Sequence, residues 1–304
     1  MSEFKVLIPL DGSRTAEHSL VYLDALKALG SLQGCFVSVI DDAEEPRTRT
    51  AEEADDREEN LLSTYLREIA GDVEKYSGVK LETKVLRGSP AERIISEAHD
   101  FAPDLIIVST HGRSGTTRWR FGSVADKVIR GAQCNTLVIG PNATEQESWI
   151  DCKLVLPFKS ILLPVDGSAL AEQAIEVAQM FARGFNSTVH IVRIVPIPTA
   201  TMGYGAEVAY VPDVLDSLVE GAKANVSDVR SHFGGMSATT EVVVGNAADE
   251  LEKYSRQHKI DLVVMTSHGR GGFLRTALGS VTDRMLAAGS APVLVVRPSD
   301  STRS

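Results

Sequence analysis

Short apolar runs alternate with longer amphipathic segments along almost the whole chain of 304 residues. The runs are nearly continuous in Val, Ile and Leu, which is typical of strands that are buried on both faces of a parallel sheet. The segments between them repeat their apolar residues with the period of an amphipathic helix. Because parallel strands joined by helices cross over with one hand, this alternation predicts doubly wound α/β domains.

The alternation runs through five strands in each half of the chain. In the first half we expect strands at 5–10, 35–40, 81–86, 104–109 and 136–139, and helices at 15–29, 53–76, 90–99 and 122–130. In the second half we expect strands at 160–165, 188–195, 239–244, 261–266 and 293–296, and helices at 169–183, 214–233, 247–258 and 279–287. The predicted fold class is α/β, with two doubly wound domains, each a five-stranded parallel sheet with helices on both faces.

The two halves repeat the same motifs. KVLIPLDGS near the start returns as SILLPVDGS, so that Asp166 follows Asp11 by 155 residues. IIVSTHGRSGTTRWRFGSVAD returns as VVMTSHGRGGFLRTALGSVTD, and Gly269 follows Gly112 by 157 residues. A repeat of this length is a whole domain and not a solenoid unit. We therefore expect three parts, which are a first domain at 1–143, a linker at 144–158 and a second domain at 159–304.

Composition narrows the possible partners and the compartment. A net charge of −10 argues against nucleic acid and against an anionic membrane as partners. No apolar run approaches the ~20 residues of a membrane-spanning helix, and the first residues lack the pattern of a signal peptide. Cys35, Cys134 and Cys152 form no CxxC pair, which is typical of a reducing compartment. We expect a cytoplasmic protein.

Most of the negative charge lies in the segment 41–59, which holds ten acidic residues against three arginines. The simpler interpretation is a solvated loop followed by the exposed face of a helix. The alternative is that this acidic segment repels phosphates from a site in the first half.

The long motif of the second half contains the parts of an anion site. Gly269 follows an expected strand and permits a turn with positive φ, and Gly279 and Ser280 open the next expected helix. Amides of a first helical turn, a hydroxyl and the positive end of the helix would meet there. This arrangement suits phosphate oxygens.

The same residues also have a purely structural interpretation. Ser123 and Ser280 each stand three residues before an aspartate, Asp126 or Asp283, which is the spacing of a capping box. A serine that caps its own helix needs no ligand.

Asp11 and Asp166 each end the first strand of their half. In a doubly wound sheet the first and fourth strands are commonly adjacent at the switch point, so each aspartate would border its glycine loop. A carboxylate there suits ribose hydroxyls. The alternative is an Asp-Gly-Ser turn that caps the next helix.

These motifs resemble those of the universal stress proteins, whose nucleotide-binding members carry Gly, two residues, Gly, nine residues and then Gly-Ser or Gly-Thr. Both halves have the second part of this spacing, from Gly112 to Gly122-Ser123 and from Gly269 to Gly279-Ser280. Both depart from it at the first glycine, where Ser109 and Thr266 stand and a β-carbon would crowd a diphosphate. The chain looks like a tandem member of the family, with one such domain in each half.

The resemblance implies a stress-response protein that binds ATP or a related adenine nucleotide, with or without Mg²⁺. The aspartates would meet the ribose, the second-strand residues the adenine and the remainder the phosphates. The matching positions are Asp11, Val39, Gly112, Gly122, Ser123 and Val124 in the first half, and Asp166, Ile194, Met265, Gly269, Gly279, Ser280 and Val281 in the second. It also implies antiparallel pairing of the fifth strands, 136–139 with 293–296, and allows a homodimer.

The halves differ in the segment after the second strand. The first half continues into the acidic segment, whereas the second continues into a loop that holds Met202 and Tyr204, with Gly203 and Gly205 as expected hinges. This loop either closes over an adenine or is an ordinary surface loop. With the charge difference, it predicts tighter nucleotide binding in the second half.

Motifs of the common catalytic classes are missing, because the chain has no GxxxxGK[ST], no GxSxG and no HExxH pattern. His111 and His268, which recur between the halves, either contact a phosphate, act as a base or shape a turn. We expect a regulatory protein that is at most a weak ATPase. The alternatives are an interaction module that has kept the fold and lost the ligand, and an enzyme such as a slow ATPase or a nucleotidyl-transferring relative on a similar fold.

Overall fold

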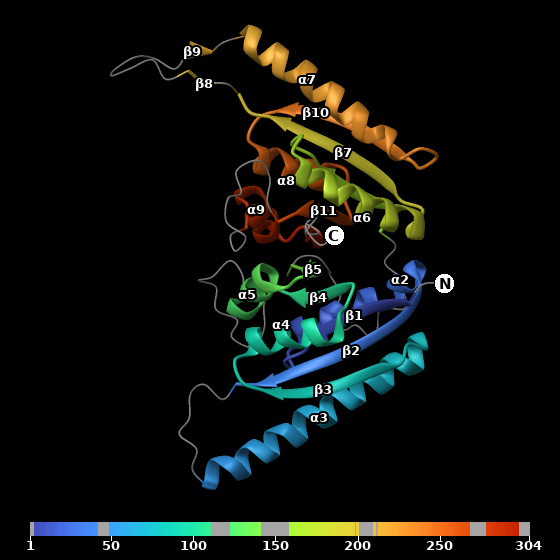
Figure 1. Ribbon diagram of the computed structural model, residues 1–304, viewed down its shortest axis with the longest axis vertical. Coiled ribbons are helices and arrows are strands. Elements are labelled where there is room, and N and C mark those ends of the chain that lie inside the picture. The colour runs from blue at the N-terminus through green and yellow to red at the C-terminus, as the bar shows by residue number, and fades with distance from the viewer. Residues whose placement is uncertain are drawn as a thin grey trace, which may run out of the picture. The chain divides into compact units, whose positions relative to one another are not determined.

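The structure, a computed structural model, describes residues 3–41, 49–110, 122–140, 158–197, 199–200, 209–210, 212–267 and 278–297. The chain divides into two compact units, Met1–Pro157 and Phe158–Ser304. Each unit contains a parallel sheet with helices packed on both faces (Figure 1). The expected linker at 144–158 and the pairing of the fifth strands stay predictions.

The sheet of the first unit has the strand order β3-β2-β1-β4-β5. Its strands are β1 (Glu3–Pro9), β2 (Ser31–Ile40), β3 (Leu81–Arg87), β4 (Leu105–Ser109) and β5 (Asn135–Ile139), paired in parallel. Its longer helices are α3 (Arg49–Ser77), α4 (Pro90–Phe101) and α5 (Ser123–Gly131). The connection from β1 to β2 is a run of short turns, which are α1 (Arg14–Glu17), η1 (His18–Tyr22), α2 (Leu23–Leu26) and η2 (Lys27–Leu29).

The second unit repeats this order as β10-β7-β6-β11-β12. Its parallel strands are β6 (Ser160–Pro164), β7 (Thr188–Val195), β10 (Ala238–Val244), β11 (Leu262–Thr266) and β12 (Val293–Val296). Its helices are α6 (Ala169–Phe185), α7 (Pro212–Ser231), α8 (Ala247–Gln257) and α9 (Ser280–Ala288). A small antiparallel pair, β8 (Thr199–Ala200) with β9 (Ala209–Tyr210), is added before α7 and was not expected from the sequence.

The order of the strands places a switch point in each unit. In the first unit β1 lies between β2 and β4, and in the second β6 lies between β7 and β11, so the chain leaves the two central strands in opposite directions. Ligands of open α/β sheets bind at the carboxyl ends of such strands. The predicted doubly wound fold and the adjacency of the first and fourth strands are confirmed.

The expected helix at 15–29 is wrong as a single element. In the structure it breaks into alternating α and 3₁₀ turns, whereas its counterpart α6 is continuous over Ala169–Phe185. Within η1 the hydroxyl of Ser19 donates to the carbonyl of Ala16, 2.6 Å away, and such back-bonding competes with the regular helical ladder. Helix α6 instead buries alanines on the face toward the sheet, and alanine has the highest helix propensity.

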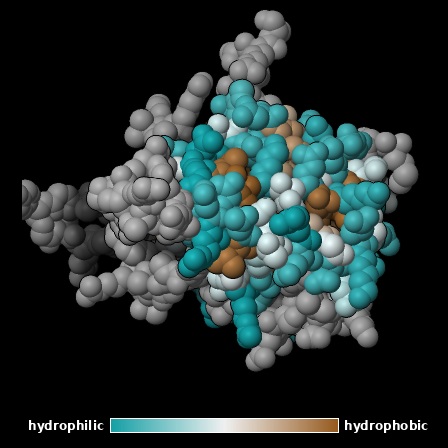
Figure 2. Space-filling view, turned by 90° about the horizontal axis from the view of Figure 1, so that it is seen from below, coloured by the Kyte–Doolittle hydropathy of each residue, from teal (hydrophilic) through white to brown (hydrophobic). Residues whose placement is uncertain are grey.

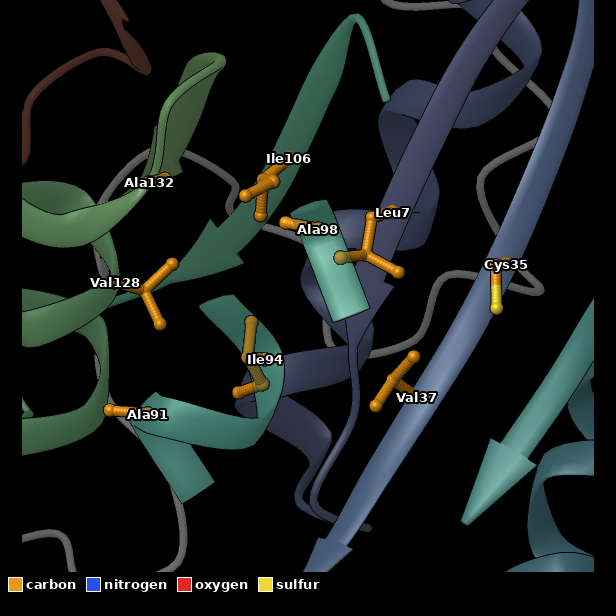
Figure 3. Close-up of a cluster of buried hydrophobic side chains, with 9 residues drawn as sticks. All are labelled: Leu7, Cys35, Val37, Ala91, Ile94, Ala98, Ile106, Val128 and Ala132. Atoms are coloured by element: carbon orange, nitrogen blue, oxygen red, sulfur yellow. The ribbon is translucent and has the colours of Figure 1, made fainter. Parts of the chain in front are cut away.

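The core of the first unit lies between the sheet and helices α4 and α5. Figure 3 shows nine buried side chains from β1, β2, β4, α4 and the end of α5 gathered there, which are Leu7, Cys35, Val37, Ala91, Ile94, Ala98, Ile106, Val128 and Ala132. Small alanines on α4 let the helix approach the larger strand residues closely. Cys35 is a free, fully buried thiol in this cluster, and burial raises its pKa to about 12. It acts as a small apolar residue.

The surface agrees with the simpler interpretation of the acidic segment where the structure describes it. Residues 56–60 of α3 are exposed, and Figure 2 shows a mainly hydrophilic face with small hydrophobic areas. Arg87 of β3 pairs with Glu59 of α3, 2.7 Å away. Among the described residues, no helix combines the length and the apolar character that crossing a membrane requires.

Candidate functional site

Each unit has an Asp-Gly-Ser turn directly after its first strand. Asp11 accepts a hydrogen bond from the Ser13 amide at 2.9 Å, and Gly12 between them has a φ of 78°. The hydroxyl of Ser13 then accepts from the Ala16 amide at 3.1 Å and caps α1. Glycine is required in the middle of this turn because other residues rarely adopt positive φ.

The second unit repeats the turn. Asp166 accepts from the Ser168 amide at 2.9 Å, Gly167 has a φ of 77°, and Ser168 caps α6 through the Ala171 amide at 3.2 Å. The turn interpretation of both aspartates is therefore confirmed. Because a carboxylate has about four lone-pair sites, this turn is compatible with the ribose role, which stays a prediction.

Val39 and Ile194 lie at the carboxyl ends of β2 and β7, beside these turns. Pro9 pairs with Val37, so the position opposite Asp11 is Val39. Pro164 pairs with Val192 in the same way, which places Ile194 next to Asp166. Both side chains are half-buried, so they can offer an apolar wall at the edge of the sheet.

Backbone hydrogen bonds close the base of the loop that follows the fourth strand. The Gly122 amide donates to the Thr110 carbonyl at 2.6 Å, and the Gly279 amide donates to the Ser267 carbonyl at 2.8 Å. The expectation that Gly279 contributes an available amide is thus wrong, since the chain itself already uses that N–H group. A β-carbon on Gly122 would lie 3.1 Å from the Thr110 carbonyl oxygen, so this close approach explains the glycine.

The capping-box interpretation of Ser123 and Ser280 is also wrong. The N-cap residues of α5 and α9 are Gly122 and Gly279, and each serine is the first residue inside its helix. A glycine has no side chain with which to accept hydrogen bonds from the first turn. Asp126 is paired instead with Arg130, whose Nε lies 2.9 Å from each of its carboxylate oxygens.

The two helix starts therefore differ from the capped starts of α1 and α6. The amides of Ser123 and Val124 in α5, and of Ser280 and Val281 in α9, belong to first turns that no N-cap side chain satisfies. The positive end of each helix dipole lies at the same place. These four amides, and not the glycine amides, are the candidate groups for holding an anion.

A side-chain hydrogen bond at the start of α9 has no equivalent at the start of α5. Thr282 of α9 donates to the carbonyl of Thr266, 3.1 Å away, and thereby fixes the first turn of α9 to β11. The corresponding residue of α5 is Ala125, which has no hydroxyl. Sequence reasoning missed this hydrogen bond and both loop-closing carbonyls, because backbone acceptors leave no signature in the sequence.

Other predicted positions contribute less or lie outside the described residues. Met265 is 7% exposed within β11, and the packing of that strand accounts for it. The predicted positions outside the described residues are Gly112, Gly269, His111, His268, Met202, Gly203, Tyr204 and Gly205. Within the described ranges, no group of three or more His, Cys, Asp or Glu side chains is arranged to hold a metal ion.

The fold and the site define a tandem doubly wound α/β protein, and comparison with known proteins gives the family. The universal stress protein family model matches residues 4–140 and 157–297. The chain therefore belongs to the universal stress protein family, with a family domain in each half.

Individual relatives agree with this assignment. A universal stress protein of Methanocaldococcus jannaschii is 30% identical over 142 residues, covering 46% of this chain and 82% of the relative. One of Mycobacterium tuberculosis is 25% identical over 231 residues, covering 73% of this chain and 70% of the relative. The crystal structure of a universal stress protein from Archaeoglobus fulgidus covers 97% of both chains with a TM-score of 0.71 at 18% identity, a likeness of fold alone.

Proposed function

We propose that the protein is a cytoplasmic regulatory protein of the stress response that binds ATP or a related adenine nucleotide. The observation that carries the proposal is the pair of helix starts at Gly122 and Gly279. Each lies after the fourth strand of its sheet, beside the switch point, and neither has a side-chain cap. An uncapped helix start at this position favours an anionic ligand.

The proposed contacts follow from the geometry of the second unit. The phosphates would accept hydrogen bonds from the Ser280 and Val281 amides and from the Ser280 hydroxyl. The ribose would meet Asp166, and the adenine would lie against Ile194. In the first unit the same roles would fall to Ser123, Val124, Asp11 and Val39, and Mg²⁺ would bind, if at all, through the phosphates.

We propose that the second unit binds the nucleotide more tightly than the first. The bond from Thr282 to Thr266 holds the start of α9 in place, and a site that is already ordered loses less entropy on binding. The acidic segment of the first unit begins at Asp41, directly after β2, and its charges would repel phosphates that come within a Debye length of about 8 Å.

Isothermal titration of the full chain with ATP tests the proposal. The informative variant is Ser280→Pro, because proline is favoured at the first helical position and removes both the amide proton and the hydroxyl. Gly279 has φ −63° and ψ 146°, a conformation that a following proline accepts. We expect binding to weaken by about tenfold or more, equivalent to one or two charge-assisted hydrogen bonds. Ser123→Pro, the matched change in the first unit, should have a smaller effect.

Two outcomes would contradict the proposal. A full chain that carries no nucleotide by mass spectrometry and gives no heat with ATP would favour the ligand-free interaction module. Equal effects of the two proline variants would remove the asymmetry. Phosphate release should be slow at most, and light scattering of the same samples reports whether a homodimer forms.

A further inference from the structure

Two histidines and a tyrosine form a polar cluster on the sheet of the second unit, away from the candidate nucleotide site. Nδ1 of His190 on β7 lies 3.1 Å from the hydroxyl of Tyr254 on α8. The ring of His258, just after α8, stacks on Tyr254 with centroids 4.0 Å apart, and lies 5.5 Å from the His190 ring. We call His190, Tyr254 and His258 the histidine cluster.

The surroundings of the histidine cluster disfavour added positive charge. His190 is half-buried, and desolvation together with the nearby His258 lowers its pKa below the usual 6.5. Burial raises the pKa of Tyr254 to about 12, with Glu241 adding to the rise, so the phenol stays neutral. The carboxylate of Glu241 on β10 acts in the opposite direction and raises the pKa of His190. On the other side of His190, β6 contributes the apolar Leu162 as its neighbour in the sheet.

The first unit has a different set of residues at the matched place. Cys35 pairs with Glu82 across β2 and β3, as His190 pairs with Thr239 across β7 and β10. Glu97 is the eighth residue of α4, and Tyr254 is the eighth residue of α8.

There the first unit holds an ion pair instead of two histidines. Nζ of Lys84 lies 2.6 Å from a carboxylate oxygen of Glu97, whose residue is 7% exposed, and this bond raises the pKa of Lys84. Burial keeps the Cys35 thiol neutral. Because the pKa of Lys84 is raised from its usual 10.5, its ammonium charge does not change near pH 6, the range in which unperturbed histidine titrates.

We propose that the histidine cluster makes the second unit acid-sensitive, so that α8 loosens from the sheet between about pH 7 and 5 while α4 of the first unit stays packed. The direction follows from proton linkage. When α8 opens, His190 returns toward its usual pKa of 6.5 and binds a proton that the packed state disfavours. The stabilisation is therefore present above pH 6.5 and is lost as the pH falls toward the lowered pKa of the packed state.

The loosening would reach a second helix. Arg284 of α9 donates to Asp249 in the first turn of α8, and the two helices pack against each other. Helix α9 begins at Ser280, directly after its N-cap Gly279, so acid would change the order of this helix start in the second unit alone. The acid response itself does not depend on whether a nucleotide binds there.

Hydrogen–deuterium exchange of the full chain at pH 7.5 and 5.5, corrected for the intrinsic pH dependence of exchange, tests the inference. We expect protection in α8 and β10 to fall by up to about tenfold for each unit of pKa difference, while α4 and β3 change less than about twofold. The double variant His190→Gln/His258→Phe should abolish the response, since glutamine keeps a polar partner for Tyr254. Phenylalanine is also the residue that the first unit has at this position, Phe101.

Two further variants separate the response from a general effect of mutation or acid. His258→Phe alone changes an exposed residue, so it should fold normally and reduce the response. His99→Gln removes a histidine from α4, where the side chain is largely exposed and next to Asp100, and should leave the response of α8 intact. Equal loss of protection in α4 and α8, or an undiminished response in the double variant, would overturn the proposal.

Discussion

At the scale of single residues, glycine is required in the candidate site for two different physical reasons. Gly12 and Gly167 are needed for their positive φ, whereas Gly122 has an ordinary φ of −61°. Gly122 is instead needed for space, because the chain returns to within hydrogen-bonding distance of Thr110. The two reasons predict different results for the same change to alanine.

Gly122→Ala should lower the free energy of unfolding by about 1–3 kcal/mol, as overpacking does, because its β-carbon would press on the Thr110 carbonyl. Gly71→Ala on the exposed side of α3 is the matched control, since nothing lies within 4 Å of its β-carbon. That change should stabilise the helix by about 0.5–1 kcal/mol. Urea denaturation of both variants measures the difference, and a stabilised Gly122→Ala would show that the loop base is more open than the structure has it.

At the scale of helices and strands, the starts of α5 and α9 are set by glycine N-caps, and those of α1 and α6 by serine N-caps. All four starts read as Gly-Ser or Asp-Gly-Ser in the sequence. The four starts differ in which residue is the N-cap, the last residue before the helix. In α5 and α9 this residue is the glycine whose amide donates to the carbonyl of Thr110 or Ser267.

Ser280→Ala should change the free energy of unfolding by less than about 0.5 kcal/mol, because Ser280 is inside its helix and caps nothing. Ser168→Ala should cost about 1 kcal/mol, because it removes the bond to the Ala171 amide. Thermal denaturation of the two variants side by side gives the comparison. A similar decrease in the free energy of unfolding for Ser280→Ala would support the capping-box interpretation instead.

Apolar period and length were enough to predict every strand of both sheets and the longer helices. The predicted strands at 188–195 and 293–296 match the structure to the residue, because Val and Ile runs bounded by polar turns have few alternatives. The break in the helix after Asp11 and the β8–β9 pair were not predictable, because a single side-chain bond or two short strands leave no periodic signal.

The sequence was enough to choose the positions of the candidate site, but not to tell which of their backbone amides are available. The repeat identified Asp11, Asp166, Gly122 and Gly279 as special positions. Whether an amide is available or already bonded depends on tertiary contacts, so the sequence did not reveal that the Gly279 amide is used by Ser267.

At the scale of the whole molecule, each unit has a core of its own. In the second unit Phe158, which is 1% exposed, packs edge-on against Phe185 with centroids 5.1 Å apart and tilted against Phe181 at 5.8 Å. The Ser187 hydroxyl donates to the Phe158 carbonyl. The aromatic cluster therefore begins with the first residue of the unit.

A fragment of residues 158–304 should fold by itself and unfold in one cooperative transition, because its aromatic cluster is complete. Phe158→Ala in the same fragment should cost about 3–5 kcal/mol, as removal of a buried phenylalanine does. Circular dichroism with urea denaturation measures both. A wild-type fragment without a cooperative transition would show that the second unit requires the first.

The hydrogen bonds from Gly122 to Thr110 and from Gly279 to Ser267 have a consequence for how this protein can diversify. Each bond holds the two ends of the intervening segment together, so we expect the helix that follows to begin at the same residue whatever length of chain lies between them. Doubling such a segment costs only about 0.6 kcal/mol in closure entropy. We therefore expect an insertion between Thr110 and Gly122, or between Ser267 and Gly279, to leave the sheet intact.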